Sequence, residues 1–185
     1  MDRTFNLFVY GTLMRGFRSN GFIPEEAVME KGKVVGNLYH YAAGYPIVQI
    51  PKDKESIEGT LDYERDLEIQ DSKNHIEPVC LPYFNEYGCV QGELYEIPYS
   101  KEVVGRLDGY EGFRGDPDTG LYCRTLVPVK TDTRIIYAWI YNMNELPSRV
   151  VRVYSGDWRD CFRPYCGMIR KEIQDALFDR DYSEE

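Results

Sequence analysis

The sequence predicts a mixed α+β domain. Short apolar stretches recur along the chain, and many of them alternate or end at glycine, which is typical of strands. Helical spacing is clear in few places, and strands do not alternate regularly with helices, so a parallel sheet with crossover helices is not expected. The chain has 185 residues and 43% hydrophobic content. This is enough for one domain with its own core, and less than two average domains need.

The first expected strand covers Leu7–Tyr10 and ends at Gly11. Its residues are apolar, β-branched or aromatic, as in a buried strand. Gly11 breaks the strand, because glycine takes a left-handed backbone freely and lets another group approach closely. A turn after a core strand leaves backbone N–H groups unpaired, and such groups can hold an anion. The pattern alone leaves two interpretations open, an ordinary strand end and an anion-binding turn.

Further elements follow this turn. Pro24 and the acidic residues after it predict the start of a helix, since proline suits the first helical position and acids suit the first turn. Strands are expected at 33–39 and 45–50, the second at an edge because it contains Pro46. Residues 62–88 are acidic and weakly periodic, so they are expected to form an irregular surface insertion. A lid over a pocket is the alternative role for this insertion.

A strand at 90–97 precedes the clearest helix. Ser100 is a suitable N-cap, and apolar residues recur at helical spacing over about 101–110. In that register Glu111 falls on the buried stripe if the helix reaches it, whereas Asp108 lies off the stripe and is expected to be solvated. A carboxylate among apolar neighbours has a raised pKa, which suits it to accept a proton from an amine near neutral pH. A glutamate at a helix end, turned to water, is the other interpretation.

The C-terminal part predicts two more strands and a tail. Strands over 121–129 and 134–141 are expected to pair antiparallel around a turn, and both tryptophans of the chain are expected in the core. Residues 161–185 form a tail beyond a single domain at 1–160. A short amphipathic helix in this tail would lie either on the body or on a second subunit, so homodimer formation stays open.

Composition restricts the partners. The net charge of −9 and the lack of any run of lysine or arginine argue against binding to nucleic acid and to acidic membrane surfaces. The N-terminal apolar run is too short for a signal peptide or a membrane span, and five cysteines without a paired framework suit a reducing compartment. The expected location is therefore the cytoplasm. No metal site is expected, because the cysteines and the two histidines lack zinc-ligand spacing.

Five segments stand out in order along the chain: FVYGTLMRG at 8–16, GYP at 44–46, GELYEI at 92–97, LDGYEG at 107–112 followed by YCR at 122–124, and RVYSGDW at 152–158. Together they resemble the gamma-glutamylcyclotransferase-like family, especially its gamma-glutamylamine cyclotransferase and avirulence-induced-gene-like branch. The resemblance implies a small β-barrel, mixed or antiparallel, flanked by a few helices. It departs at 62–88 and in the tail, which leaves the pocket mouth and the identity of the substrate open.

The resemblance also implies an activity of acyltransferase or lyase type. The family converts a gamma-glutamyl amine or peptide into 5-oxoproline and a free amine without a cofactor, because nucleophile and electrophile share one molecule. Its catalytic acid/base maps onto Glu111. Tyr122 would hydrogen-bond the substrate, and Arg124 would either pair with a substrate carboxylate or form a structural salt bridge. The turn that would hold the substrate carboxylate and carbonyl oxygen consists of Tyr10, Gly11, Thr12 and Leu13.

Two alternatives remain. A protein on the same fold can be a catalytically silent small-molecule-binding or interaction module, and the presence of Glu111 argues for the enzyme instead. An enzyme that removes a gamma-glutamyl protecting group from a specialised amine would share the chemistry and differ only at the pocket mouth.

Overall fold

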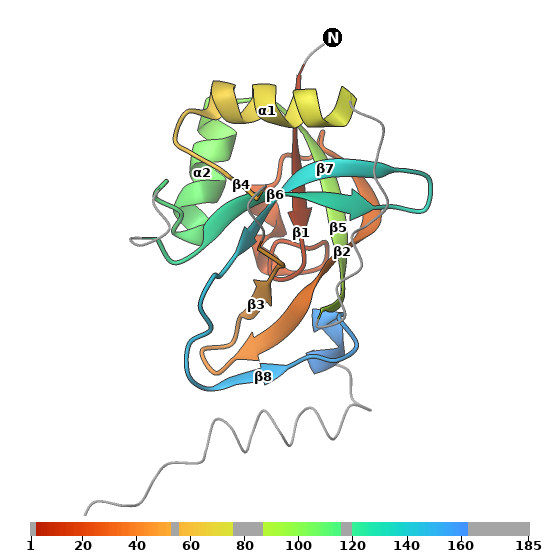
Figure 1. Cartoon of the computed structure of the whole chain (residues 1–185), viewed down its shortest axis with the longest axis vertical. Coiled ribbons are helices and arrows are strands. Elements are labelled where there is room, and N and C mark those ends of the chain that lie inside the picture. Colours follow the sequence, from red (N-terminus) through yellow and green to blue (C-terminus); the bar gives the residue numbers. More distant parts are fainter. Residues whose placement is uncertain (1–2, 53–55, 76–86, 116–119, 163–185) are drawn as a thin grey trace, which may run out of the picture.

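The structure is a computed structural model of the chain, and it describes residues 3–52, 56–75, 87–115 and 120–162. Five strands close into a barrel at its centre (Figure 1): β1 (Thr4–Val9), β2 (Val28–Tyr41), β5 (Gly88–Pro98), β6 (Cys123–Lys130) and β7 (Ile135–Asn142). The order around the barrel is β2-β5-β1-β7-β6, and the pairing of Lys33 with Lys130 joins β2 to β6. Of these neighbours β1 and β7 run parallel, and the others are antiparallel.

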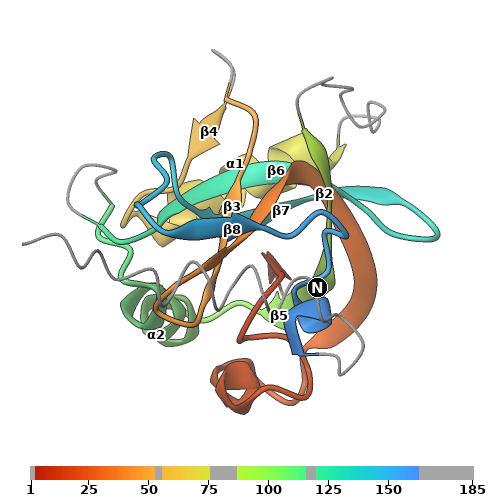
Figure 2. The same cartoon turned by 90° about the horizontal axis from the view of Figure 1, so that it is seen from below.

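Shorter elements surround the barrel: the strands β3 (Pro46–Gln49), β4 (Ile57–Glu58) and β8 (Val150–Arg152), the helices α1 (Tyr63–His75) and α2 (Lys101–Glu111), and the 3-10 helices η1 (Arg18–Phe22) and η2 (Trp158–Phe162). In Figure 1, α1 crosses one end of the barrel and α2 stands beside it. Figure 2 gives the view from below, where β3 and β8 flank the second half of β2, with which both pair. Within the described ranges, no helix is long and apolar enough to cross a membrane.

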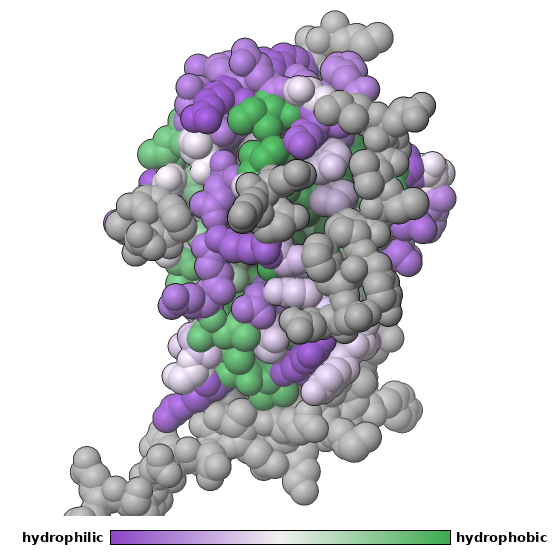
Figure 3. Space-filling view, viewed as in Figure 1, coloured by the Kyte–Doolittle hydropathy of each residue, from purple (hydrophilic) through white to green (hydrophobic). Residues whose placement is uncertain are grey.

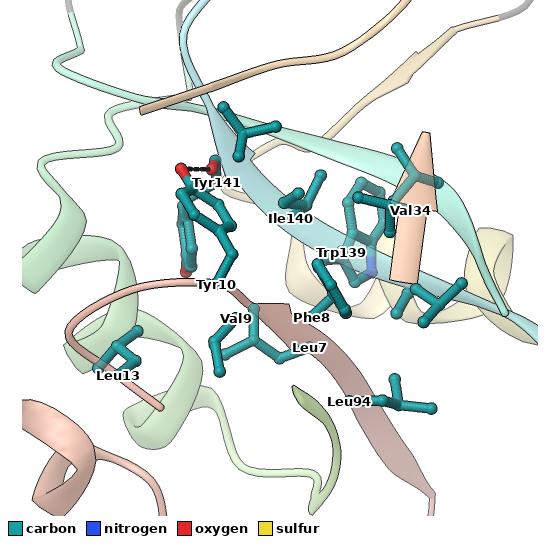
Figure 4. Close-up of a cluster of buried hydrophobic side chains, with 14 of the residues drawn as sticks. Leu7, Phe8, Val9, Tyr10, Leu13, Val34, Leu94, Trp139, Ile140 and Tyr141 are labelled. Atoms are coloured by element: carbon teal, nitrogen blue, oxygen red, sulfur yellow. Dashed lines mark hydrogen bonds between the residues drawn. The ribbon is translucent and has the colours of Figure 1, made fainter. Parts of the chain in front are cut away.

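Large apolar side chains fill the barrel, and a glycine makes room for them. Phe8 of β1 and Trp139 of β7 are fully buried and lie among aliphatic side chains (Figure 4). Each such side chain contributes about 1.5–3 kcal/mol by its burial. A Cβ atom at Gly92 would lie 2.2 Å from the Val9 carbonyl oxygen and 2.7 Å from the Phe8 ring. Gly92 is therefore needed for β5 to approach β1 this closely.

Most of the predicted strands are confirmed. Residues 33–39 lie within β2, and the edge strand expected at 45–50 contains β3. Residues 121–129 and 134–141 largely coincide with β6 and β7, which pair antiparallel as expected. The two tryptophans are buried, and the α+β class with a small barrel is confirmed.

The helix expected to start at Pro24 is wrong. The backbone N–H of Ala27 donates to the Pro24 carbonyl at 3.2 Å and closes a single turn, after which β2 begins at Val28. The proline and the acids therefore mark a turn before a strand. They carry no helical repeat of apolar residues behind them, and it is that repeat which commits a segment to a buried helix.

The irregular insertion expected at 62–88 is also wrong in its first half, because Tyr63–His75 form helix α1. Hydrogen bonds hold α1 on the barrel. Its Gln70 side chain accepts from the Asn6 backbone N–H and donates to the Thr4 carbonyl, both at 2.8 Å, so it pairs with β1 much as a strand would. The lid alternative for 62–88 depends on its second half, most of which is residues 76–86, and the tail expected at 161–185 consists mostly of residues 163–185. Residues 76–86 and 163–185 lie outside the described residues.

The upper end of the molecule is hydrophilic, in keeping with this helix. Figure 3 shows polar residues gathered over α1, with apolar residues appearing below it. Arg3 forms two salt bridges on its surface, with Glu64 at 3.2 Å and with Asp71 at 3.1 Å. Both are exposed, so each contributes at most about 1 kcal/mol. Most of the interactions that hold α1 in place are therefore on the side that faces the barrel.

Candidate active site

A cavity of about 210 Å³ opens where β1 and α2 end. The turn after β1 and the last turn of α2 form two of its walls, and the start of β3 and the residues before β6 complete it. The residues that line it are Phe8, Val9, Tyr10, Gly11, Thr12, Leu13, Tyr45, Pro46, Tyr110, Glu111, Leu121, Tyr122 and Tyr141. The turn and the glutamate that the sequence singled out, far apart along the chain, therefore share one cavity.

Helix α2 places Glu111 at this cavity because it persists to its predicted end. Ser100 caps the helix by accepting a hydrogen bond from the Val103 backbone N–H, and Leu107 is fully buried on the apolar stripe. Gly112 stops the helix in a left-handed conformation with φ of 69°, and its N–H donates to the Asp108 carbonyl. Glu111 is thus the last helical residue, one turn beyond Leu107, as the extended register requires.

The environment of Glu111 favours its neutral form. Burial, and after it the charge of Asp108, raise the pKa of the Glu111 carboxyl to about 8. Among the described residues, none donates a hydrogen bond to this carboxyl to offset that effect. The residue remains partly accessible from the cavity. A carboxyl with such a pKa can both take up and release a proton near neutral pH.

Asp108 is buried, which corrects the expectation that it is solvated. Its carboxylate accepts two hydrogen bonds from Arg124 Nη1, at 2.6 and 2.7 Å, and one from the Tyr141 hydroxyl at 2.6 Å. Burial raises the pKa of the Asp108 carboxyl, and the charge of Arg124 opposes that effect. The buried face of α2 is wider than its apolar residues indicate, because Arg124 of β6 pairs with Asp108 and so allows this carboxylate to be buried.

Of the two roles expected for Arg124, a contact with a substrate carboxylate and a structural salt bridge, the structure contains the salt bridge. The Arg124 side chain is fully buried, and its Nη2 pairs with Asp66 at 2.6 Å and donates to the Thr60 carbonyl at 2.7 Å. The guanidinium carbon lies 4.7 Å from the centre of the Phe113 ring. Arg124 is not among the residues that line the cavity. It joins the carboxylates of α1 and α2 and is not available to a substrate carboxylate.

Space, and not a left-handed backbone, requires glycine at position 11. Gly11 has no positive φ, which corrects the first of the two reasons expected from the sequence. A Cβ atom there would lie 2.2 Å from the Pro46 side chain, so the close neighbour is a wall of the cavity. The Met14 N–H donates to the Gly11 carbonyl at 2.9 Å and closes the turn. Within the described part of the chain, no group accepts from the backbone N–H of Thr12 or Leu13.

A buried carboxylate behind the turn fixes its shape. Glu93 of β5 accepts from the Arg15 backbone N–H at 2.7 Å and pairs with Arg159 at 2.6 Å. Asn20 donates to the Leu13 carbonyl at 2.7 Å from the other side. The free N–H groups are therefore held in place before any ligand arrives. Glu93 stood in the GELYEI segment, but nothing in the local pattern paired it with a turn in another part of the chain.

Five of the described tyrosines line the cavity. Four of them, Tyr10, Tyr110, Tyr122 and Tyr141, donate a hydroxyl hydrogen bond to another group of the protein. Tyr122 donates to the Pro46 carbonyl at 2.7 Å, and Tyr10 donates to the Tyr141 carbonyl at 2.6 Å (Figure 4). Burial raises the pKa of Tyr122 well above its usual value, so this hydroxyl stays protonated. Because its hydroxyl proton is used, Tyr122 can contact a ligand through its ring or accept a hydrogen bond from it, but it is not expected to donate one. Sequence reasoning placed Tyr110 in a helix and Tyr141 in a strand but assigned neither to the site, although both line the cavity.

Comparisons with known proteins agree with this fold. The family model described as gamma-glutamyl cyclotransferase, AIG2-like, matches residues 7–88 and 65–160. The crystal structure of YkqA from Bacillus subtilis is 24% identical with a TM-score of 0.52, over 91% of this chain and 42% of that one. An aig2-like protein from Mus musculus is 19% identical with a TM-score of 0.53, over 85% of this chain and 90% of that one.

These structural similarities support the fold and nothing further. This chain spans less than half the length of YkqA. No protein in a search of curated sequences matches the chain. The family model, in contrast, covers most of the chain, including the turn at Gly11 and the end of α2. The chain therefore belongs to the gamma-glutamyl cyclotransferase, AIG2-like family.

Proposed function

We propose that the protein is a gamma-glutamyl cyclotransferase that converts a gamma-glutamyl amine into 5-oxoproline and a free amine, with Glu111 as the general acid/base. One observation carries the proposal: a single cavity joins the Glu111 carboxyl to the turn in which the backbone N–H groups of Thr12 and Leu13 have no acceptor among the described residues. Membership of the family supports a cyclotransferase-like function. The substrate and the role of each residue are our inference.

The charges of the cavity match the two ends of a gamma-glutamyl group. The N–H groups of Thr12 and Leu13 can donate to the substrate carboxylate or to its carbonyl oxygen. Among the described residues that line the cavity, Glu111 carries the only carboxyl, and none carries a basic side chain. The α-ammonium of the substrate is therefore expected to bind beside Glu111, and the carboxylate and carbonyl oxygens of the substrate are expected to bind at the turn.

The reaction is an intramolecular displacement. Glu111 takes one proton from the substrate α-ammonium, and the neutral amine attacks the γ-carbonyl carbon to form the lactam C–N bond. Glu111 gives this proton to the leaving nitrogen as the C–N bond of the amide breaks, and takes up the surplus proton of the ring nitrogen. The departing amine finally accepts that proton and leaves as an ammonium ion. No water and no redox partner enters, and the carboxyl returns to its starting state.

Two effects would account for the rate. The rigid turn holds the substrate folded, so that amine and carbonyl lie within reach of each other. A positioned acid/base contributes about 10²- to 10⁴-fold. Its efficiency depends on a pKa near the working pH, which burial and Asp108 together bring about in Glu111.

The test is to incubate the protein with gamma-glutamyl amines, gamma-glutamyl amino acids and glutathione, and to measure 5-oxoproline. Glu111→Gln is expected to lower kcat by about 10²- to 10⁴-fold with an unchanged circular dichroism spectrum. Glu102→Gln, which alters an exposed carboxylate on the same helix, is the matched control and should retain full activity.

Equal activity of Glu111→Gln and the unaltered protein would exclude Glu111 from the mechanism. If no member of the panel gives 5-oxoproline while calorimetry shows binding of a gamma-glutamyl compound, the protein is a silent binding module on this fold.

A further inference from the structure

A second cavity of about 570 Å³ lies beside the first. The two share Tyr45 and Leu121 as common wall residues. The first cavity, at about 210 Å³, is smaller than the roughly 300–1,000 Å³ usual for small-molecule sites. It suits the glutamyl part of a substrate and leaves little space for the rest. A leaving group that continues past Tyr45 and Leu121 would enter the second cavity.

The junction between the cavities offers apolar contact area. Leu121 is 55% exposed, an unusual state for a leucine next to a cavity. Tyr45 is partly buried, and its ring lies 5.1 Å from that of Tyr41 and 6.4 Å from that of Tyr122. Tyr45 thus contacts the residues of both cavities. An aliphatic or aromatic stem that leaves the first cavity would cover Leu121 and pack against these rings.

The charge of the second cavity distinguishes among leaving groups. Its wall beyond the tyrosines includes the apolar side chains of Met143 and Leu146 and the exposed carboxylate of Glu145. Of the described residues that line it, none is basic. A carboxylate and the faces of tyrosine rings both favour a cation. A leaving group with its own carboxylate, such as an amino acid, would meet repulsion from Glu145.

We propose, on the basis of the function proposed above, that this second cavity is the subsite for the leaving amine and selects an amine with an apolar stem and a distal cation. Leu121 and Tyr45 position the stem, and Glu145 lies at the cationic end. The chemistry of the first cavity is unchanged by this subsite, because the leaving nitrogen stays beside Glu111.

The test compares four substrates on the full chain: the gamma-glutamyl amides of methylamine, diaminobutane, pentylamine and aminopentanoate. The last three have stems of matched length that end in a cation, a methyl group and a carboxylate. We expect kcat/KM, relative to the methylamine compound, to be highest for the diaminobutane compound and lowest for the aminopentanoate compound. Glu145→Gln should reduce the ratio of the diaminobutane to the pentylamine compound by about two- to fivefold, the size expected for one exposed ion pair.

Leu146→Ala should lower the relative rates of the diaminobutane and pentylamine compounds to a similar extent, because it shortens the apolar wall. Glu68→Gln, which removes an exposed carboxylate on α1, is the control and should leave all ratios unchanged. Equal relative rates for the three long substrates, or ratios unaffected by Glu145→Gln, would overturn the subsite while leaving the cyclotransferase intact. Failure to turn over any substrate, the methylamine compound included, would overturn the proposed function itself, and the subsite with it.

Discussion

The two α-helices reach the barrel by different means. Helix α2 presents an apolar stripe, in which Val104 and Leu107 are fully buried, and sequence periodicity was enough to predict it. Helix α1 fully buries Asp66 and Gln70 beside Leu67, whereas Tyr63 and Ile69 are only partly buried against the core, so much of its inner face is polar. A polar inner face gives no hydrophobic repeat, and the segment was expected to be irregular. Periodicity detects helices that pack, and it misses helices that are held by specific hydrogen bonds.

The two helices nevertheless meet at one residue. Asp66 of α1 and Asp108 of α2 pair with the same guanidinium, that of Arg124 in β6. Arg124 therefore links α2, which the sequence predicted, to α1, which it did not. The contributions of α1 and α2 to stability can therefore be compared by removing the shared ion pair first, and then the contacts that belong to each helix alone.

Arg124→Met should have the largest effect on stability. It leaves two buried carboxylates without their cation, and removal of one partner of a buried pair costs about 3–5 kcal/mol. Urea unfolding followed by circular dichroism measures the loss. Arg134→Met is the matched control, since Arg134 forms exposed pairs with Glu30 and Glu96 and should cost about 1 kcal/mol or less.

Similar losses in the two arginine variants would contradict the structural importance of the buried pair. If Arg124→Met does not fold, Asp66→Asn gives a milder test. It removes one charge and retains a polar side chain beside Thr60, whose backbone N–H donates to Asp66. This variant should fall between the other two in stability.

Gln70→Leu tests how α1 is held. Leucine is apolar and of similar size, but it leaves the Asn6 N–H and the Thr4 carbonyl without their partner. We expect a loss of about 1–3 kcal/mol in the free energy of unfolding. Glu68→Gln, on the exposed side of the same helix, should change it by no more than about 0.5 kcal/mol. An unaffected or more stable Gln70→Leu protein would mean that apolar contact holds α1 after all.

Asp108→Asn tests the influence of one α2 carboxyl on another through the pH dependence of kcat/KM. Burial and the Asp108 charge raise the pKa of Glu111 to about 8, and asparagine removes the second of these contributions. Because Glu111 must be ionised to take the ammonium proton in the proposed mechanism, the rising limb of the profile should move to lower pH, by up to about one unit. Asp71→Asn on α1 should leave the limb in place. A limb at the same pH in both variants would show that Asp108 does not act on Glu111.

Ser100→Ala should have the smallest effect. It removes the N-cap of α2, where the Ser100 hydroxyl accepts from the Val103 N–H at 3.4 Å. Such caps contribute about 1 kcal/mol, which thermal unfolding resolves as a shift in Tm. Ser72→Ala, inside α1 and exposed, should be neutral or slightly stabilising because alanine favours the helix interior. Equal losses in both variants would argue against the cap.

Local pattern predicted the features that depend on neighbouring residues. The strands around Phe8 and Trp139 follow from apolar and β-branched runs, and Glu111 follows from the register of α2. The structure brings Glu111 and the turn at Gly11 to one cavity, as the resemblance implied. Their roles in catalysis stay predictions until the variants are made.

Features that depend on distant partners could not be predicted in the same way. Asp108 is buried because Arg124 and the Tyr141 hydroxyl come to it from other strands. Gly11 is needed because Pro46 lies against it, and a neighbour so far along the chain leaves no mark on the local sequence. Polar burial is decided by such long-range pairing, whereas apolar periodicity is written within a single element.

The position of β1 has a consequence for the order of folding. This first strand lies between β5 and β7, and its partners run as far along the chain as Asn142. Contacts of such long sequence separation close large loops, which costs entropy and slows folding. A nascent chain that stops before β7 has no second neighbour for β1, and the turn that follows it is left without one of its supports. The candidate site and the closed barrel are therefore expected to form together, once β7 has paired with β1.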